Sequence, residues 1–158
     1  MSDCPMTPFG KKLIEDELAL LIKNDREQIK QAIAEARELG DLKENAEYAA
    51  AKERQSIIEG RIMDLQSKLA RARVIDVATL SANTKIVFGA SVTIFDNQKE
   101  IETSFQIVGE DEAMNDPKKI SFNSPLGRAL IGKEVGDEVI VKAPKGDLTY
   151  EVISLKYN

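Results

Sequence analysis

Two carboxylates three residues apart, Asp41 and Glu44, are the side chains of this sequence whose type and spacing suggest chemistry most directly. They stand between two helix-forming segments, where Asp-x-x-Glu can act as a capping box: Asp41 caps a backbone amide and Glu44 reaches back. Both acids also favour the positive end of a helix dipole. The spacing alone therefore favours helix capping, and Asp-x-x-Glu by itself is a weak pattern.

The same two carboxylates also suit part of a magnesium site. Two acids are too few to enclose an ion, but Mg²⁺ keeps several waters and takes only one or two protein carboxylates, with phosphate oxygens as further ligands. We expect no cofactor on this chain alone. Placed in another protein's active site, Asp41 and Glu44 could complete a second Mg²⁺ site, which activates a water for phosphodiester cleavage. Capping and metal binding are compatible if the outer carboxylate oxygens stay free.

The composition excludes several other kinds of chemistry. The 158 residues include no His and a single Cys, Cys4, which rules out Ser-His-Asp and Cys-His catalysis, His- or multi-Cys-ligated zinc and an internal disulfide. With 22 Lys and Arg against 27 Asp and Glu, the net charge of −5 argues against a broad basic face for nucleic-acid phosphates. Because no apolar run approaches about 18 residues and no apolar leader is present, we expect a cytoplasmic protein without membrane contact, with Cys4 a free thiol.

The first half of the chain, which positions the acids, has the composition of two long helices. Strong helix formers dominate from Pro8 to about Asp76, with no further Pro. Apolar residues step by three and four, as in the narrow seam of a coiled coil. The predicted seam of the first helix is Ile14, Leu18, Leu21, Asp25, Ile29, Ala32 or Ile33, Ala36 and Leu39; that of the second is Ala46, Ala50, Glu53, Ile57 or Ile58, Ile62, Leu65, Leu69 and Ala72.

These helices are predicted to form an antiparallel hairpin that carries the acids at its tip. Gly40 suits the left-handed end of the first helix, and Asp41 suits the N-cap of the second. Arms of about 27 residues, at ~1.5 Å per residue, give a thin rod of roughly 40 Å. Asp25 interrupts the seam, and either Arg61 neutralises it or the polar position fixes the register of the two helices.

From about residue 80 the sequence changes to short alternating segments typical of strands, which we expect at 90–95, 101–108, 119–122, 138–143 and 148–155. Ser124, Pro125 and Gly132 predict the N-cap, first residue and end of one short helix. The predicted fold is therefore α+β, with a domain boundary near residues 76–84. A helical hairpin over 1–76, with its acidic tip at 40–48, precedes a small antiparallel sheet with a helix over 80–158.

Longer motifs resemble one protein family along essentially the whole chain. They are MTPFGKKLIEDEL near the start, AIAEARELGDLKENAEY at the predicted tip and SPLGRALIGKEVGDEV in the second half. The nine residues GDLKENAEY, lying between two helices, are far more specific than Asp-x-x-Glu. On these motifs the chain resembles the bacterial Gre transcript-cleavage factors.

The resemblance implies a coiled coil followed by an FKBP-like domain, in an accessory factor that is not an enzyme alone. The globular domain would dock at the rim of the secondary channel of RNA polymerase, on the coiled coil of its largest catalytic subunit. The rod would carry Asp41 and Glu44 to the active centre, where they help hold a second Mg²⁺ and a water. The polymerase would then cleave the backtracked RNA and free a new 3′ end, so that elongation resumes. Asn45 and Tyr48 would orient the acids or the RNA, and we expect a monomer.

Each of the remaining candidate residues allows a structural and a functional interpretation. Arg37, Lys52 and Arg54 are either solvated helix charges or a basic patch that guides the RNA 3′ segment, and Arg37 should face Tyr48 across the hairpin. Tyr48 either fills the seam or stacks on a base. A segment of the second domain either caps its helix or lies at the surface that grips the polymerase; its residues are Ser121, Asn123, Ser124 and Pro125.

Three other functions remain open on the sequence. A channel-binding regulator of the same shape would occupy the polymerase without cleavage. An FKBP-like fold also allows a prolyl isomerase or chaperone, although the second domain shows no clear aromatic pocket pattern. A structural coiled-coil adaptor would be insensitive to the charge of its tip.

Overall fold

We describe the fold from a computed structural model, for residues 3–81 and 83–157. The chain forms two compact units, one of Lys12–Arg71 and the other of Asp3–Lys11 together with the chain from Ala72 onward. The α+β class is confirmed. The division differs from the predicted domain boundary near 76–84 because strand β1 (Cys4–Met6) pairs in parallel with β2 (Ala72–Val74), which joins the N-terminal segment to the second unit.

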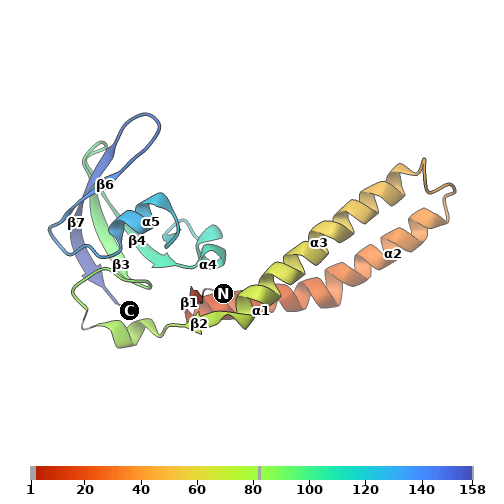
Figure 1. The fold of residues 1–158 in the computed structure, drawn as a ribbon, viewed down its shortest axis with the longest axis horizontal. Coiled ribbons are helices and arrows are strands. Elements are labelled where there is room, and N and C mark those ends of the chain that lie inside the picture. The colour runs from red at the N-terminus through yellow and green to blue at the C-terminus, as the bar shows by residue number, and fades with distance from the viewer. Residues whose placement is uncertain (1–2, 82, 158) are drawn as a thin grey trace. The chain divides into compact units, whose positions relative to one another are not determined.

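Helices make up the first unit, and two of them run side by side as a hairpin (Figure 1). Helix α1 (Pro8–Leu20) continues through a π-helical turn over Leu21–Asp25 into α2 (Arg26–Arg37). Helix α3 (Ala46–Ala70) returns along α2. Among the described residues, no helix is both long and apolar enough to cross a membrane.

The seam of the hairpin follows the prediction in α2 but not at the start of α3. Ile29, Ile33 and Ala36 are buried as expected, whereas Leu39 is 66% exposed because α2 ends at Arg37. In α3 the predicted positions Ala46, Ala50 and Glu53 are exposed. The inward positions of α3 run in steps of three and four and are Tyr48, Ala51, Gln55, Ile58, Ile62 and Leu65. Three consecutive alanines at 49–51 fit both the predicted and the observed seam. The larger side chains around them therefore determine which face of α3 is turned inward.

Two bidentate ion pairs join the arms on either side of the π turn. Arg26 donates to both carboxylate oxygens of Glu59, at 2.9 and 2.8 Å. Arg61 donates to both oxygens of Glu17, at 2.6 and 2.9 Å, and also pairs with Asp64. Such planar two-bond pairs fix orientation as well as charge, and therefore hold the register of the helices. The predicted Asp25–Arg61 pairing gains no support, since the bidentate partner of Arg61 is Glu17.

A five-stranded sheet forms the second unit, in the order β5-β4-β3-β7-β6. All neighbours are antiparallel except β4 and β5, which pair in parallel, so the sheet is mixed at one edge. The strands are β3 (Ser91–Asp96), β4 (Ile101–Val108), β5 (Lys119–Ser121), β6 (Glu138–Val141) and β7 (Leu148–Lys156). The other elements are the 3₁₀ helix Val77–Leu80, α4 (Glu110–Met114) and α5 (Pro125–Leu130).

The apolar core of this unit lies where α5 packs on the sheet (Figure 1). Leu130 of α5 is fully buried with one side-chain face of strands β3, β4, β6 and β7. That set consists of Val92, Ile94, Ile107, Val139, Val141 and Val152, joined by Ile86 and Ala90. In β3 and β6 the core residues stand at every second position, which is the period of two that predicted them. In β4, Ile107 is followed directly by Val108, which is also fully buried.

A buried polar cluster attaches the N-terminal segment to this unit. Thr7 and Glu112 are each only 4% exposed, and the Thr7 hydroxyl donates to the Glu112 carboxylate. Lys119 donates to the other Glu112 oxygen at 2.7 Å and lies 4.5 Å from the centre of the Phe9 ring. A backbone bond from Ile75 to the Met6 carbonyl, 2.9 Å long, continues the pairing of β1 with β2.

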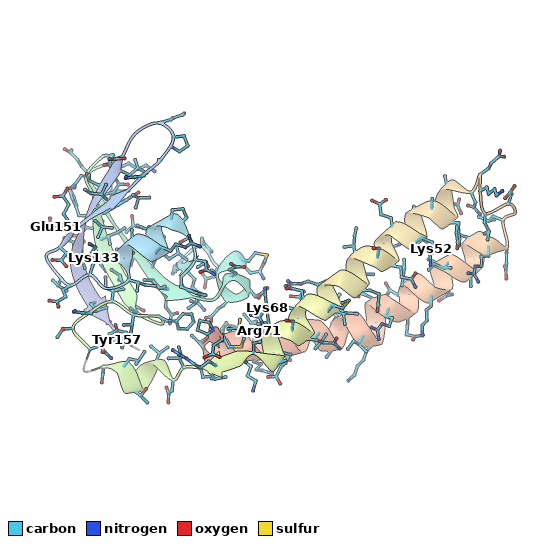
Figure 2. The ribbon with its side chains drawn as sticks, viewed as in Figure 1. Lys52, Lys68, Arg71, Lys133, Glu151 and Tyr157 are labelled. Carbon is cyan, nitrogen blue, oxygen red and sulfur yellow. The ribbon has the colours of Figure 1, made fainter. Side chains whose placement is uncertain are left out.

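Tyr157 (Figure 2) follows β7 and bonds to the backbone of the segment before β3. Its hydroxyl donates to the Lys85 carbonyl at 2.6 Å and accepts from the Val87 amide at 3.1 Å. Burial of the ring raises the pKa of Tyr157 above its ordinary value. The two hydrogen bonds of the phenol tie the segment before β3 to the residue after β7.

Candidate functional site at the hairpin tip

The tip loop, defined as residues 38–45, connects α2 to α3 and carries both predicted acids. Gly40 has φ of +130°, a conformation that side-chain-bearing residues rarely adopt, so the glycine makes the turn possible. The Asp41 carboxylate accepts a hydrogen bond from the backbone amide of Lys43, two residues later, at 2.9 Å. This local bond stabilises the turn between the two residues.

Asn45, and not Asp41, is the N-cap of α3, so the predicted capping role of Asp41 is wrong. The Asn45 side-chain oxygen accepts from the Tyr48 amide at 3.0 Å, and its backbone is extended as an N-cap requires. Its side-chain nitrogen donates to the Ala36 carbonyl in the last turn of α2, at 2.5 Å. Asparagine is as good an N-cap as aspartate, so the sequence contained this signal, but the Asp-x-x-Glu spacing drew the prediction four residues upstream.

The carboxylates of Asp41 and Glu44 remain exposed to solvent. Among the described residues, Glu44 has no hydrogen-bond or ion-pair partner, and only one oxygen of Asp41 is engaged. The predicted reach of Glu44 back to a capping residue is therefore not formed. Three of the four carboxylate oxygens are free to take an external partner.

This donor set fits a metal ion that is shared with another molecule. Carboxylate oxygens are the hard ligands that Mg²⁺ prefers, and one or two are the usual protein contribution. Within the described part of the chain, no group of three or more His, Cys, Asp or Glu residues is arranged to hold a metal. Asp41 and Glu44 can thus contribute to a magnesium site but cannot make one.

Arg37 and Tyr48 meet across the hairpin directly behind the tip. The Arg37 guanidinium lies 5.9 Å from the centre of the Tyr48 ring, within cation–π range, as the predicted pairing of the arms requires. Tyr48 is half-buried and also packs in the seam beside Ile33 and Ala51. The Tyr48 ring therefore packs in the seam and also contacts the Arg37 guanidinium.

The other two basic candidates lie on the exposed surface of α3. Lys52 (Figure 2) donates to Gln55 at 3.0 Å, and Arg54 has no partner among the described residues. Both side chains point away from the seam, because the inward positions of this part of α3 are Ala51 and Gln55. They can meet an external anion without any rearrangement of the hairpin.

The four docking candidates lie at the start of α5. Ser124 is its N-cap, accepting from the Gly127 amide at 3.0 Å, and it donates to the Ser121 carbonyl at 2.7 Å. The Asn123 amide donates to the Ser121 hydroxyl at 3.1 Å, and Pro125 is the first helical residue. The capping interpretation of this segment is thus confirmed. Asn123 and Pro125 are exposed, so the segment also lies at the surface of the second unit.

Comparison with known proteins gives matches to both halves of the chain. The family described as transcription elongation factor, N-terminal, matches residues 4–74, and transcription elongation factor GreA/GreB, C-terminal, matches residues 81–157. The chain is 58% identical over 153 residues to the transcription elongation factor GreA of Francisella philomiragia, which covers 97% of this chain and 96% of that one. GreA of Francisella tularensis subsp. novicida is 56% identical with the same coverage. Among solved structures, Gfh1 of Thermus aquaticus is 27% identical over 99% of both chains, with a TM-score of 0.45.

Proposed function

Because this chain belongs to the GreA/GreB family of transcription elongation factors, we propose that it binds bacterial RNA polymerase and stimulates cleavage of backtracked RNA by the polymerase itself. In this proposal the factor is an accessory protein with no catalytic activity alone. One copy acts on each polymerase in the cytoplasm. It enters the secondary channel tip first and releases the arrested complex by allowing a new RNA 3′ end to form.

The observation that carries this proposal is the pair of uncommitted carboxylates in the tip loop. Asp41 and Glu44 lie in a short turn between two long helices, with three oxygens free. We propose that they hold a second Mg²⁺ together with ligands of the polymerase active centre. When bound there, this ion would lower the pKa of a coordinated water and stabilise the charge that develops during phosphodiester cleavage.

The basic residues behind the tip are proposed to guide the extruded RNA. Lys52 and Arg54 present exposed cations on α3, and Arg37 adds a third beside the Tyr48 ring. Because phosphates are attracted to such charges at low ionic strength, this patch would align the RNA 3′ segment with the acids. The half-buried position of Tyr48 supports a role in the seam and in holding Arg37 more than stacking on a base.

The start of α5 is proposed to be the docking surface for the polymerase. Asn123 and Pro125 are exposed, while Ser121 and Ser124 hold their backbone by hydrogen bonds. This surface would bind the coiled coil of the largest catalytic subunit at the channel rim. In this proposal docking and metal binding use different units of the chain, which allows them to be tested separately.

Cleavage of RNA in stalled, backtracked elongation complexes tests the proposal directly. We expect Asp41→Asn and Glu44→Gln each to reduce the stimulated cleavage rate at least tenfold, about 1.4 kcal/mol in the barrier, with unchanged affinity for the polymerase. Glu47→Gln is the matched control, because Glu47 is an exposed acid in the first turn of α3, outside the tip loop, and should keep full activity.

Two outcomes would overturn the proposal. Full stimulation by the double variant of Asp41 and Glu44 would show that the carboxylates are not used. Occupation of the polymerase by the unaltered protein without any cleavage would instead identify a regulator that blocks the channel.

A further inference from the structure

Asn45 is the only tip-loop side chain that the structure shows bonded to the backbone of both arms of the hairpin. Its oxygen accepts from the Tyr48 amide of α3, and its nitrogen donates to the Ala36 carbonyl of α2. Ala36 lies in the last turn of α2, where carbonyls have no partner in the helix ladder, although this one also accepts from the Leu39 amide at 3.2 Å. One carboxamide thus satisfies a helix end on each side of the loop.

The two hydrogen bonds of Asn45 close the tip loop at the point where it joins the two helices. Residues 38–44 lie between its two attachment points, and both acids are among them. Glu44 directly precedes Asn45 and has no bond of its own within the described chain, so its backbone position depends on its neighbour. Asp41 is tied only to the Lys43 amide inside the same loop. Without the bridge, the described side-chain bonds would no longer connect the loop to α2.

We propose that Asn45 is a positioning residue for the two carboxylates. This inference rests on the proposed function. The Asn45 carboxamide fixes the positions of Asp41 and Glu44 relative to both helices. It does not touch metal or RNA. Since errors of about 1 Å in placing a reacting group can lower a rate by about a hundredfold, a fixed loop base matters for the rate and not for docking.

Three substitutions separate this role from helix capping. Asn45→Asp and Asn45→Ser both keep an oxygen for the Tyr48 amide and are good N-caps. Neither can reproduce the bond to Ala36: aspartate has no donor and serine is too short. Asn45→Ala loses both bonds. Serine is neutral, so its agreement with aspartate would exclude an effect of the added charge on magnesium.

The first measurement is made on the protein without polymerase. Amide exchange followed by NMR should be at least tenfold faster at Leu39 and Lys43 in Asn45→Asp and Asn45→Ser, because their hydrogen bonds lie within the loop that the bridge closes. Exchange at Ala51, in the seam, should be unchanged because α3 remains capped. Wild-type exchange at Leu39 and Lys43 in both variants would overturn the bridge.

The second measurement is the dependence of RNA cleavage on factor and on Mg²⁺. We expect Asn45→Asp and Asn45→Ser to lower the maximal stimulated rate about tenfold or more and to raise the half-saturating Mg²⁺ concentration, with the half-saturating factor concentration unchanged. A loss seen only in Asn45→Ala would show that capping alone matters and would overturn the inference. Failure of the unaltered protein to stimulate cleavage would count against the proposed function, whereas amide exchange judges the bridge independently.

Discussion

Replacement of the buried acid Glu112 by glutamine tests what holds the N-terminal segment Asp3–Lys11 on the second unit. One Glu112 oxygen accepts from the Thr7 hydroxyl and the other from Lys119, whose side chain is 17% exposed. Glutamine is nearly the same size but has one acceptor oxygen and no charge. Its amide nitrogen must face either an ammonium group or a hydroxyl that already accepts from the Gly10 amide at 2.9 Å.

The magnitude follows from the bonds that are lost. A hydrogen bond to a charged group contributes about 1.5–3 kcal/mol, and Glu112→Gln removes one of them while it weakens the other. We expect the segment to be held about 2 kcal/mol less tightly. Since 1.4 kcal/mol corresponds to a factor of ten, local opening should become about thirtyfold more frequent.

Amide exchange at Ile75 is the assay, because this amide donates to the Met6 carbonyl and becomes free only when β1 leaves β2. Exchange at Ile75 should be about thirtyfold faster in Glu112→Gln. The Val152 amide, which bonds to Asp137 in the sheet region, should keep its rate. Glu110→Gln, an exposed acid of the same short helix α4, is the matched control and should change neither. Unchanged exchange at Ile75, or equal acceleration at Val152, would refute the assignment of Glu112 to this segment.

Three further substitutions have defined outcomes. In Gly127→Ala, a Cβ would lie 2.2 Å from the Ser121 carbonyl oxygen, so we expect a loss of about 3 kcal/mol or more in urea unfolding of the second unit, and a change below 0.5 kcal/mol would contradict this geometry. Gly40→Ala meets no atom within 4 Å but must adopt φ of +130°, a strain of about 1–3 kcal/mol, and should reduce stimulated RNA cleavage while polymerase affinity is kept. The hydrogen bonds donated by the Arg26 side chain lower the pKa of Glu59 in the folded protein. The pair therefore stabilises the hairpin fully at pH values above the unfolded pKa of Glu59, near 4.5. This stabilisation is lost as the pH falls through the lower pKa of the folded state. Thermal melting between pH 6 and 2 should therefore show a smaller acid-induced fall in the melting temperature for Glu59→Gln than for the unaltered protein, and equal falls would exclude this linkage.

The sequence alone predicted a helical hairpin followed by a sheet domain and the strands of that sheet, but not the membership of Asp3–Lys11 in the second unit. Both follow from local periodicity: steps of three and four in the first half and alternation in the second, which report the faces that must be buried. The cap of α5 was also readable, since Ser124 and Pro125 are a local signal that needs no distant partner. The motif that resembles the Gre factors likewise located Asp41 and Glu44, and the structure places both in the tip loop.

Tertiary structure decided the features that depend on residues far apart in the chain. The seam of α3 uses Tyr48 and Ala51 because α2 is beside them, and a run of alanines contains no local preference between registers. The N-cap role of Asn45 was readable from the sequence, but its second bond, to the Ala36 carbonyl at the end of α2, depends on how the two arms meet. Thr7 and Glu112 are 105 positions apart, so no pattern in the sequence could pair them; only packing of the N-terminal segment against α4 places a hydroxyl, a carboxylate and an ammonium group within reach of one another.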